Sequence, residues 1–126
     1  KGNVLLNKYL IQNSANFSLS DVKFNKDGLI PVISQCTNTG KVLMMAWMNK
    51  DALEKTLSSK YMFYYSRSRS KLWKKGESSG HFQKLLELRL DCDNDTFLAI
   101  IEQTGVACHT GSQSCFFKAI DSVQNE

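Results

Sequence analysis

The sequence lacks the features that mark membrane proteins, fibrous proteins and secreted chains. Proline occurs once in the 126 residues, and the longest nearly uncharged run, residues 42–48, is far too short to span a bilayer. The chain does not open with the basic, apolar and small-residue pattern of a signal peptide. Hydrophobic residues make up 42% and charged residues 22%, a composition that excludes disorder. We therefore expect a single soluble domain over residues 1–126, cytoplasmic, without a membrane or export role.

Cysteine is also scarce, and its spacing argues against two common uses. The four cysteines could form two disulfides in three connectivities, but nothing in the sequence points to an oxidising compartment. Zinc fingers place cysteines two to four residues apart. Here 15 residues separate Cys92 from Cys108, and six separate Cys108 from Cys115. Reduced thiols that bind a metal are favoured, while Cys36 lies apart and is interpreted as a small buried residue.

Positive charge is concentrated in one part of the chain. The formal net charge is +4, and residues 66–89 alone carry seven basic and two acidic side chains. The remaining residues are therefore slightly acidic. Such a segment suits phosphate groups, whether on a nucleic acid or on a small phosphorylated ligand, and a solvated surface strand and loop is the alternative.

Hydrophobic periodicity predicts an α+β fold that is predominantly β, a compact domain with one or two helices. Turn residues 38–40 should join two strands into a hairpin, and Asn49 can cap a helix that begins at Lys50. Residues 1–20 are weakly patterned and could include a short helix. The predicted strands are residues 29–33, 42–48, 61–65, 82–90, 97–101 and 116–120.

Two of these strands carry sharper predictions. Pro31 cannot donate a ladder hydrogen bond, so it favours an edge strand or the first residues of a strand. Within residues 82–90, apolar and polar side chains alternate with the period of a half-buried strand. We therefore expect Leu86, Leu88 and Leu90 to share the buried face.

The continuation of that strand predicts two separate metal sites. If the strand extends a few residues further, Cys92 shares the apolar face with Leu90. The alternate residues Asp91, Asp93 and Asp95 then point to the polar face. The thiol and the carboxylates would serve different metals.

Three cysteines and a histidine form the first candidate site. Cys92, Cys108 and Cys115 offer three thiolates with no evident fourth protein ligand, which resembles a catalytic zinc site whose fourth position holds water. His109 directly follows Cys108 and is the candidate base, although a structural role is the alternative. His81 could contact substrate or simply hydrogen-bond its glycine-rich loop.

Three aspartates form the second candidate site. Asp91, Asp93 and Asp95 match positions 1, 3 and 5 of an EF-hand, and Glu102 falls at position 12, but Thr96 replaces the required glycine. We therefore reject an EF-hand. Three carboxylates on one face still favour a hard cation, with magnesium preferred where phosphates are bound. An acidic turn with solvated side chains is the alternative.

The basic segment offers groups suited to phosphate oxygens. Ser66, Arg67, Ser68 and Arg69 combine guanidinium and hydroxyl groups, and residues 74–81 combine lysines, hydroxyls and glycine backbone. Together with a zinc-type site, these groups suggest hydrolysis of a phosphorylated small molecule.

Taken in order, these motifs resemble the phosphoribosyl-AMP cyclohydrolase family of histidine biosynthesis. The resemblance runs from about Phe24 to Phe117. It includes the segments at residues 27–31, 42–49, 66–69, 73–81, 91–95 and 108–115. It implies hydrolytic opening of the adenine ring of N1-(5-phosphoribosyl)-AMP at the N1–C6 bond, with zinc used and magnesium also required.

The resemblance also implies which residues form the site. Zinc would be held by Cys92, Cys108 and Cys115, and magnesium by Asp91, Asp93 and Asp95. His109 and His81 would be catalytic. The substrate-binding residues would be Ser66, Arg67, Ser68, Arg69, Trp73, Lys75, Gly76, Glu77, Ser78, Ser79 and Gly80. The family is an intertwined homodimer whose zinc ligands come from both subunits.

This chain departs from the family pattern at two positions. Ser78 stands where the family commonly has threonine, which keeps the hydroxyl. Gln113 stands where a basic residue is often found between the last two cysteines. That change affects the expected phosphate or dimer contacts of the loop.

Two other functions compete with the hydrolase. The basic, aromatic-rich residues 61–75 suit a nucleic-acid-binding module with a structural metal, although the resemblance leads us to expect no nucleic acid partner. A zinc deaminase would release ammonia, but the usual His-x-Glu and Cys-x-x-Cys pairing is absent.

Overall fold

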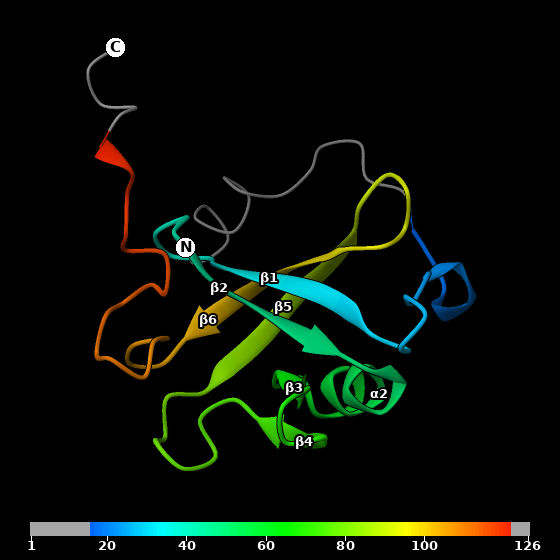
Figure 1. The fold of residues 1–126 in the computed structure, drawn as a ribbon, viewed down its shortest axis with the longest axis horizontal. Coiled ribbons are helices and arrows are strands. Elements are labelled where there is room, and N and C mark those ends of the chain that lie inside the picture. The colour runs from blue at the N-terminus through cyan, green and yellow to red at the C-terminus, as the bar shows by residue number, and fades with distance from the viewer. Residues whose placement is uncertain (1–15, 122–126) are drawn as a thin grey trace.

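The computed structural model describes residues 16–121 of the chain. At its centre is a curled six-stranded sheet with the order β4-β3-β2-β1-β6-β5 (Figure 1). Neighbouring strands are antiparallel, except β1 and β6, which are parallel. The elements are the 3-10 helix η1 (Leu19–Asp21), β1 (Ile30–Cys36), β2 (Val42–Met48), α2 (Lys50–Ser59), β3 (Phe63–Ser66), β4 (Lys71–Lys74), β5 (Gln83–Leu90) and β6 (Phe97–Gln103).

The sheet partly closes on itself because the segment before β3 reaches β5. The Met62 amide donates to the Gln83 carbonyl at 2.9 Å, and the Leu85 amide donates to the Lys60 carbonyl at 2.7 Å. These bonds satisfy backbone groups that an open edge strand would expose. The predicted fold class, predominantly β with a helix, is confirmed.

The predicted hairpin at residues 38–40 is confirmed. The Cys36 amide donates to the Lys41 carbonyl, and the Gly40 amide donates to the Cys36 carbonyl, both at 2.8 Å. Gly40 adopts a φ of 76°, which glycine reaches without the steric penalty of a Cβ atom. Cys36 is buried, as predicted for a small residue in the core.

Pro31 occupies the first residues of β1, one of its two predicted positions. It pairs with Trp47 of β2, whereas the pairing of β1 with β6 begins one residue later, at Val32 and Phe97. The missing amide of Pro31 therefore costs no ladder hydrogen bond to β6. An edge strand, the other predicted position, is excluded because β1 lies between β2 and β6.

Strand β5 follows the predicted range, but its faces change at a bulge. Its pairing with β6 shifts between Leu85 and Glu87. Leu85 is buried and Leu86 is 39% exposed, so the prediction that Leu86 lies on the buried face is wrong. An extra residue in one strand reverses the side-chain alternation beyond it. Leu88 and Leu90 do pack against the core, as predicted.

Helix α2 is the predicted helix and contacts β2, β3 and β4. The Asn49 side chain accepts a hydrogen bond from the Ala52 amide at 2.9 Å, which satisfies a donor of the first turn. The helix ends at Ser59, and the residue that caps it, Lys60, has a φ of 69°. Ala52, Leu53 and Thr56 form its buried side. No helix within residues 16–121 is both long and apolar enough to cross a membrane.

One further expectation is wrong, and one strand was not predicted. Residues 116–120, predicted as the last strand, form none, and Phe116, Phe117 and Ile120 are exposed by 61%, 53% and 70%. A short apolar run is typical of a buried strand, but an apolar surface has the same composition. The sequence patterns also did not predict β4, because lysines flank its two apolar residues. The short helix considered around residues 4–10 falls outside the described residues.

Candidate active site

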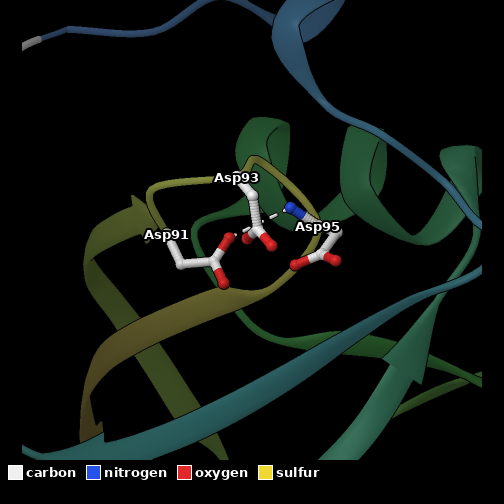
Figure 2. Close-up of side chains that lie close together, drawn as sticks. All are labelled: Asp91, Asp93 and Asp95. Carbon is white, nitrogen blue, oxygen red and sulfur yellow. Dashed lines mark hydrogen bonds between the residues drawn. The ribbon is translucent and has the colours of Figure 1, made fainter.

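The turn between β5 and β6 gathers three carboxyl groups. Oxygens of Asp91, Asp93 and Asp95 all lie within 4.8 Å of one another, and Figure 2 shows these side chains pointing toward one another. The Asp91 Oδ1 atom accepts the amide hydrogens of Asp95 at 3.0 Å and Thr96 at 3.2 Å. Asn94 adopts a φ of 69°, a conformation that asparagine tolerates better than most residues. The turn itself therefore brings the carboxylates together.

This cluster has the electrostatics of a cation site. Against the effect of desolvation, the Asp95 amide, the Asp93 carboxyl and the Thr96 amide lower the pKa of Asp91. Hydrogen-bond contact with the carboxyl groups of Asp95 and Asp91 raises the pKa of Asp93. Like charges held this close favour a retained proton or a bound cation. Within residues 16–121, no other group of three His, Cys, Asp or Glu side chains is close enough to hold one ion.

A second cluster lies in the loop that follows β6, at residues 107–115. The Cys108 amide donates to the Ser112 carbonyl at 3.2 Å, which folds the loop back on itself. The Cys115 amide donates to the Leu43 carbonyl of β2 at 2.7 Å, which fixes the loop to the sheet. As a result the thiols of Cys108 and Cys115 lie close enough for each to affect the pKa of the other.

The surroundings of these two thiols favour a charged sulfur at Cys108. The Thr110 hydroxyl donates to the Cys108 sulfur at 3.0 Å. This hydrogen bond, with smaller effects that include the charge of Lys75, lowers the pKa of Cys108. Partial burial and the neighbouring Cys108 raise the pKa of Cys115. The sequence patterns did not single out Thr110, although a hydroxyl two residues after a cysteine is the signal that could have found it.

Cys92, the third predicted zinc ligand, does not join the other two thiols within one chain. β5 ends at Leu90, so the predicted strand continuation is wrong, and Cys92 is exposed in the turn. The turn and the 107–115 loop lie at opposite ends of β6 (Figure 1). Since β6 has seven residues, its ends are about 20 Å apart. A single chain therefore supplies two of the three predicted thiolates at one place.

The arginines occupy the turn between β3 and β4. The Arg69 amide donates to the Ser66 hydroxyl at 3.2 Å, and the Arg67 guanidinium lies 4.8 Å from the centre of the Trp47 ring. A cavity of about 700 Å³ opens beside this turn. The predicted substrate-binding residues that line it are Ser66, Arg67, Ser68, Arg69 and Trp73. These five positions are therefore brought together around one cavity.

The glycine-rich loop places His81 against the segment that follows β6. A Cβ atom on Gly76 would lie 2.6 Å from the His81 carbonyl carbon, and one on Gly105 would lie 2.5 Å from the imidazole Cδ2. The His81 amide donates to the Ser79 hydroxyl at 3.1 Å. The other predicted loop residues, Glu77, Ser78, Ser79 and Gly80, are exposed. His81 thus packs on the segment that leads to Cys108, where His109 is exposed.

A basic side chain from another part of the chain lies beside Gln113 in the 107–115 loop. The Lys41 ammonium donates to Gln113 Oε1 at 2.9 Å. A positive charge is therefore present where the sequence pattern had suggested its loss. It comes from the β1–β2 hairpin rather than from the loop itself.

The aromatic run before the basic turn does not form a stacking surface. None of residues 61–65 is exposed, and Met62 and Tyr64 are fully buried. The Tyr64 hydroxyl donates to Gln83 Oε1 at 2.7 Å inside the sheet. Nucleic-acid-binding modules need exposed aromatic faces for base stacking. Of the aromatic residues in 61–75, Tyr65 and Trp73 line the cavity beside the arginine turn.

Comparison with known proteins assigns the chain to a family. A family model described as phosphoribosyl-AMP cyclohydrolase matches residues 44–117, which include every predicted site residue. The chain belongs to the phosphoribosyl-AMP cyclohydrolase family. It is therefore an enzyme, and the resemblance noted in the sequence is confirmed. Family membership also links the chain to histidine biosynthesis.

Several relatives named phosphoribosyl-AMP cyclohydrolase are similar over most of their length. One from Rhodospirillum rubrum is 62% identical over 99 residues, covering 79% of this chain and 69% of the relative. One from Acidiphilium cryptum is 57% identical over 102 residues, covering 81% and 88%. One from Pseudomonas putida is 54% identical over 107 residues, covering 84% and 82%. The aligned cyclohydrolase region thus accounts for most of this chain.

Proposed function

We propose that this protein opens the adenine ring of N1-(5-phosphoribosyl)-AMP by hydrolysis at the N1–C6 bond, as a zinc-dependent, cytoplasmic homodimer. The observation that carries the proposal is the pairing of the Cys108 and Cys115 thiols on one loop of a cyclohydrolase-family chain. Thiolates are the ligands that zinc prefers. The Thr110 hydrogen bond favours the ionised sulfur that a metal requires.

The third zinc ligand in this proposal is Cys92 of a second copy. A two-fold dimer makes every contact twice, so the β5–β6 turn of each subunit can meet the 107–115 loop of the other. The dimer then holds two equivalent sites. The exposed side chains of Phe116 and Phe117, directly after Cys115, supply the apolar area that a dimer interface buries.

In this proposal the histidines move the protons. Zinc, when bound, supplies Lewis acidity that lowers the pKa of a water molecule. His109, adjacent to Cys108, accepts the proton of the attacking water and returns one to ring N1 as its bond to C6 breaks. His81 holds the substrate or takes part in the proton transfer. The exocyclic amine stays on C6 as an amide, so the reaction releases no ammonia, unlike deamination.

The substrate carries two phosphate monoesters, each with a charge of roughly −1.5 to −2 near neutral pH. Arg67 and Arg69 provide forked donors for one of them in the cavity beside Trp73. Backbone and hydroxyl groups of residues 76–80 would bind polar groups of the substrate near His81. The Asp91, Asp93 and Asp95 carboxylates fit magnesium, which bridges carboxylates and phosphates in many enzymes.

The proposal is tested by the ultraviolet absorbance of phosphoribosyl-AMP mixed with the purified protein. The absorbance of the ring-opened product should grow with zinc and magnesium present, stop when a chelator removes them, and return when zinc is restored. An ammonia assay run in parallel should stay negative. Unchanged absorbance with folded, zinc-loaded protein would contradict the proposed reaction, and released ammonia would indicate a deaminase.

Substituting Gly105 by alanine should lower activity by displacing His81. The new Cβ atom would lie 2.5 Å from the imidazole, so the ring must move. Displacing a group by about 1 Å can cost up to about 10²-fold in rate, and we expect kcat/KM to fall at least about tenfold. Steady-state kinetics with the ring-opening assay measures this.

The matched control is Gly28→Ala, at a second glycine with a left-handed backbone. Gly28 has a φ of +76° and Gly105 a φ of +71°, but a Cβ atom on Gly28 meets nothing within 4 Å. Both substitutions add similar backbone strain, about 1–2 kcal/mol. Equal kinetic losses in the two variants would show that the His81 contact has no role.

A further inference from the structure

The side chain of Lys75 is directed toward the thiol loop rather than toward the arginine turn. Lys75 directly follows β4, and its amide donates to the Met62 carbonyl at 3.0 Å. The β3–β4 turn that holds Arg67 and Arg69 lies at the other end of β4. Four strand residues separate the two ends, about 13 Å. Lys75 therefore does not belong to the arginine cluster.

The ammonium of Lys75 is hydrogen-bonded to the backbone next to Cys108. Lys75 Nζ donates a short hydrogen bond to the Ala107 carbonyl. Ala107 is buried, and its own amide donates to the Gln113 carbonyl at 3.3 Å. The side chain of Lys75 is partly buried, and Nζ lies 5.7 Å from the centre of the Trp73 ring. These contacts hold the charge beside the loop.

A positive charge at this position offsets the negative charge of the thiol pair. Burial lowers the pKa of Lys75, while the nearby sulfurs of Cys115 and Cys108 act in the opposite direction, so its ammonium lies within electrostatic reach of both thiols. A zinc ion with three thiolates carries a net charge of −1, which is unfavourable in a partly desolvated site without a counterion. One lysine makes the group neutral.

We propose that Lys75 is a positioning residue of the thiolate metal site, and not a ligand of substrate phosphate. It fixes the Ala107 carbonyl, and with it Cys108, and it neutralises the charge of the metal-bound thiolates. The inference rests on the proposed function, because it requires that Cys108 and Cys115 bind zinc. It reassigns Lys75 from the predicted substrate-binding set.

The test measures zinc affinity in the full-length protein by competition with a chromophoric chelator. Replacing a group that supports metal ligands typically lowers affinity roughly 10- to 100-fold, and we expect this loss for Lys75→Met. Lys75→Arg, which keeps the charge and a donor, should recover most of it. At saturating zinc, Lys75→Met should keep a KM for phosphoribosyl-AMP close to that of the unmodified protein.

A neighbouring lysine provides the matched control. Lys74 Nζ lies over the rings of Tyr61 and Phe82, at 5.2 Å and 4.9 Å from their centres. Lys74→Met removes the same charge one residue away and should leave zinc affinity unchanged. Circular dichroism confirms that each variant is folded.

The outcomes separate this inference from the proposed function. If the unmodified protein binds no zinc through its cysteines, the proposed function fails. If it does bind zinc, but Lys75→Met binds zinc equally tightly and has a raised KM, Lys75 is a phosphate ligand and the inference is overturned. An equal loss of zinc affinity in Lys74→Met and Lys75→Met also overturns it. The loss of one positive charge anywhere near the site would then explain the effect.

Discussion

Substituting Cys108 by serine should abolish turnover while the protein stays folded. Serine keeps a hydroxyl that can accept the Thr110 hydrogen bond, so the loop has no reason to unfold. It removes a thiolate ligand, and we expect kcat/KM to fall by about 10³-fold or more, equal to about 4 kcal/mol of transition-state stabilisation. Zinc content by atomic absorption should fall in parallel with the rate.

Cys36 provides the control for this substitution. It is a buried cysteine on β1, outside the proposed site. Cys36→Ala should reduce stability modestly, because it shortens a buried side chain, and should leave zinc content and kcat/KM unchanged. A Cys108→Ser variant that retains its zinc and its activity would remove the thiol loop from the chemistry.

Substituting Asp93 by asparagine should weaken the binding of magnesium but stabilise the metal-free protein. Removing one of three ligands should raise the magnesium concentration for half-maximal activity at least about tenfold. Without metal, the same change relieves repulsion among the carboxylates. The thermal midpoint in chelator should therefore rise at neutral pH.

The pH dependence of this stability effect follows from the protonation of Asp93. The carboxyl groups of Asp95 and Asp91 raise the pKa of Asp93 above its usual range. The folded protein thus binds this proton more tightly than the unfolded chain does. The resulting stability is present below the ordinary carboxyl pKa of about 3.9 and is lost as pH rises through the raised value.

The stability difference between Asp93→Asn and the unmodified protein should accordingly appear only as the pH rises through that range. Asp27→Asn, at an exposed turn residue that is not one of the three clustered carboxylates, is the control and should show neither effect. A variant with unchanged magnesium dependence would show that the three carboxylates do not bind the functional cation.

The sequence predicted the elements whose signals are local. The hairpin at residues 38–40, the helix capped by Asn49 and the buried run of β6 each depend on a few neighbouring residues, and all three were predicted. The bulge at Leu86 was not, because it becomes visible only in the pairing of β5 with β6. The apolar run at 116–120 gave a wrong strand, because composition does not reveal whether a partner strand exists.

In the candidate site, too, the features with local signals were predicted and those that depend on long-range contacts were not. Spacing alone marked the aspartate turn and the thiols of Cys108 and Cys115, and the structure brings each set together. Spacing could not show that Cys92 lies at the opposite end of β6. The role of Lys75 was also hidden, because its partner carbonyl at Ala107 lies 32 residues away in the chain.

The most direct test of the shared site combines two inactive variants in one dimer. Cys92→Ser and Cys108→Ser carry different tags, are produced together, and the mixed dimers are confirmed by purification on both tags. If the sites are shared, both substitutions of a mixed dimer fall in the same site, which then lacks two thiols. The other site keeps all three thiols. An equal mixture should therefore regain about one quarter of the activity of the unmodified protein, because half of the dimers carry one intact site of two.

Each variant alone should remain inactive. If each zinc site were built from one chain, every site in the mixed dimers would lack one thiol and no activity would return. Recovery near one quarter is the result we predict, and mixed dimers without activity would contradict a zinc site shared between subunits.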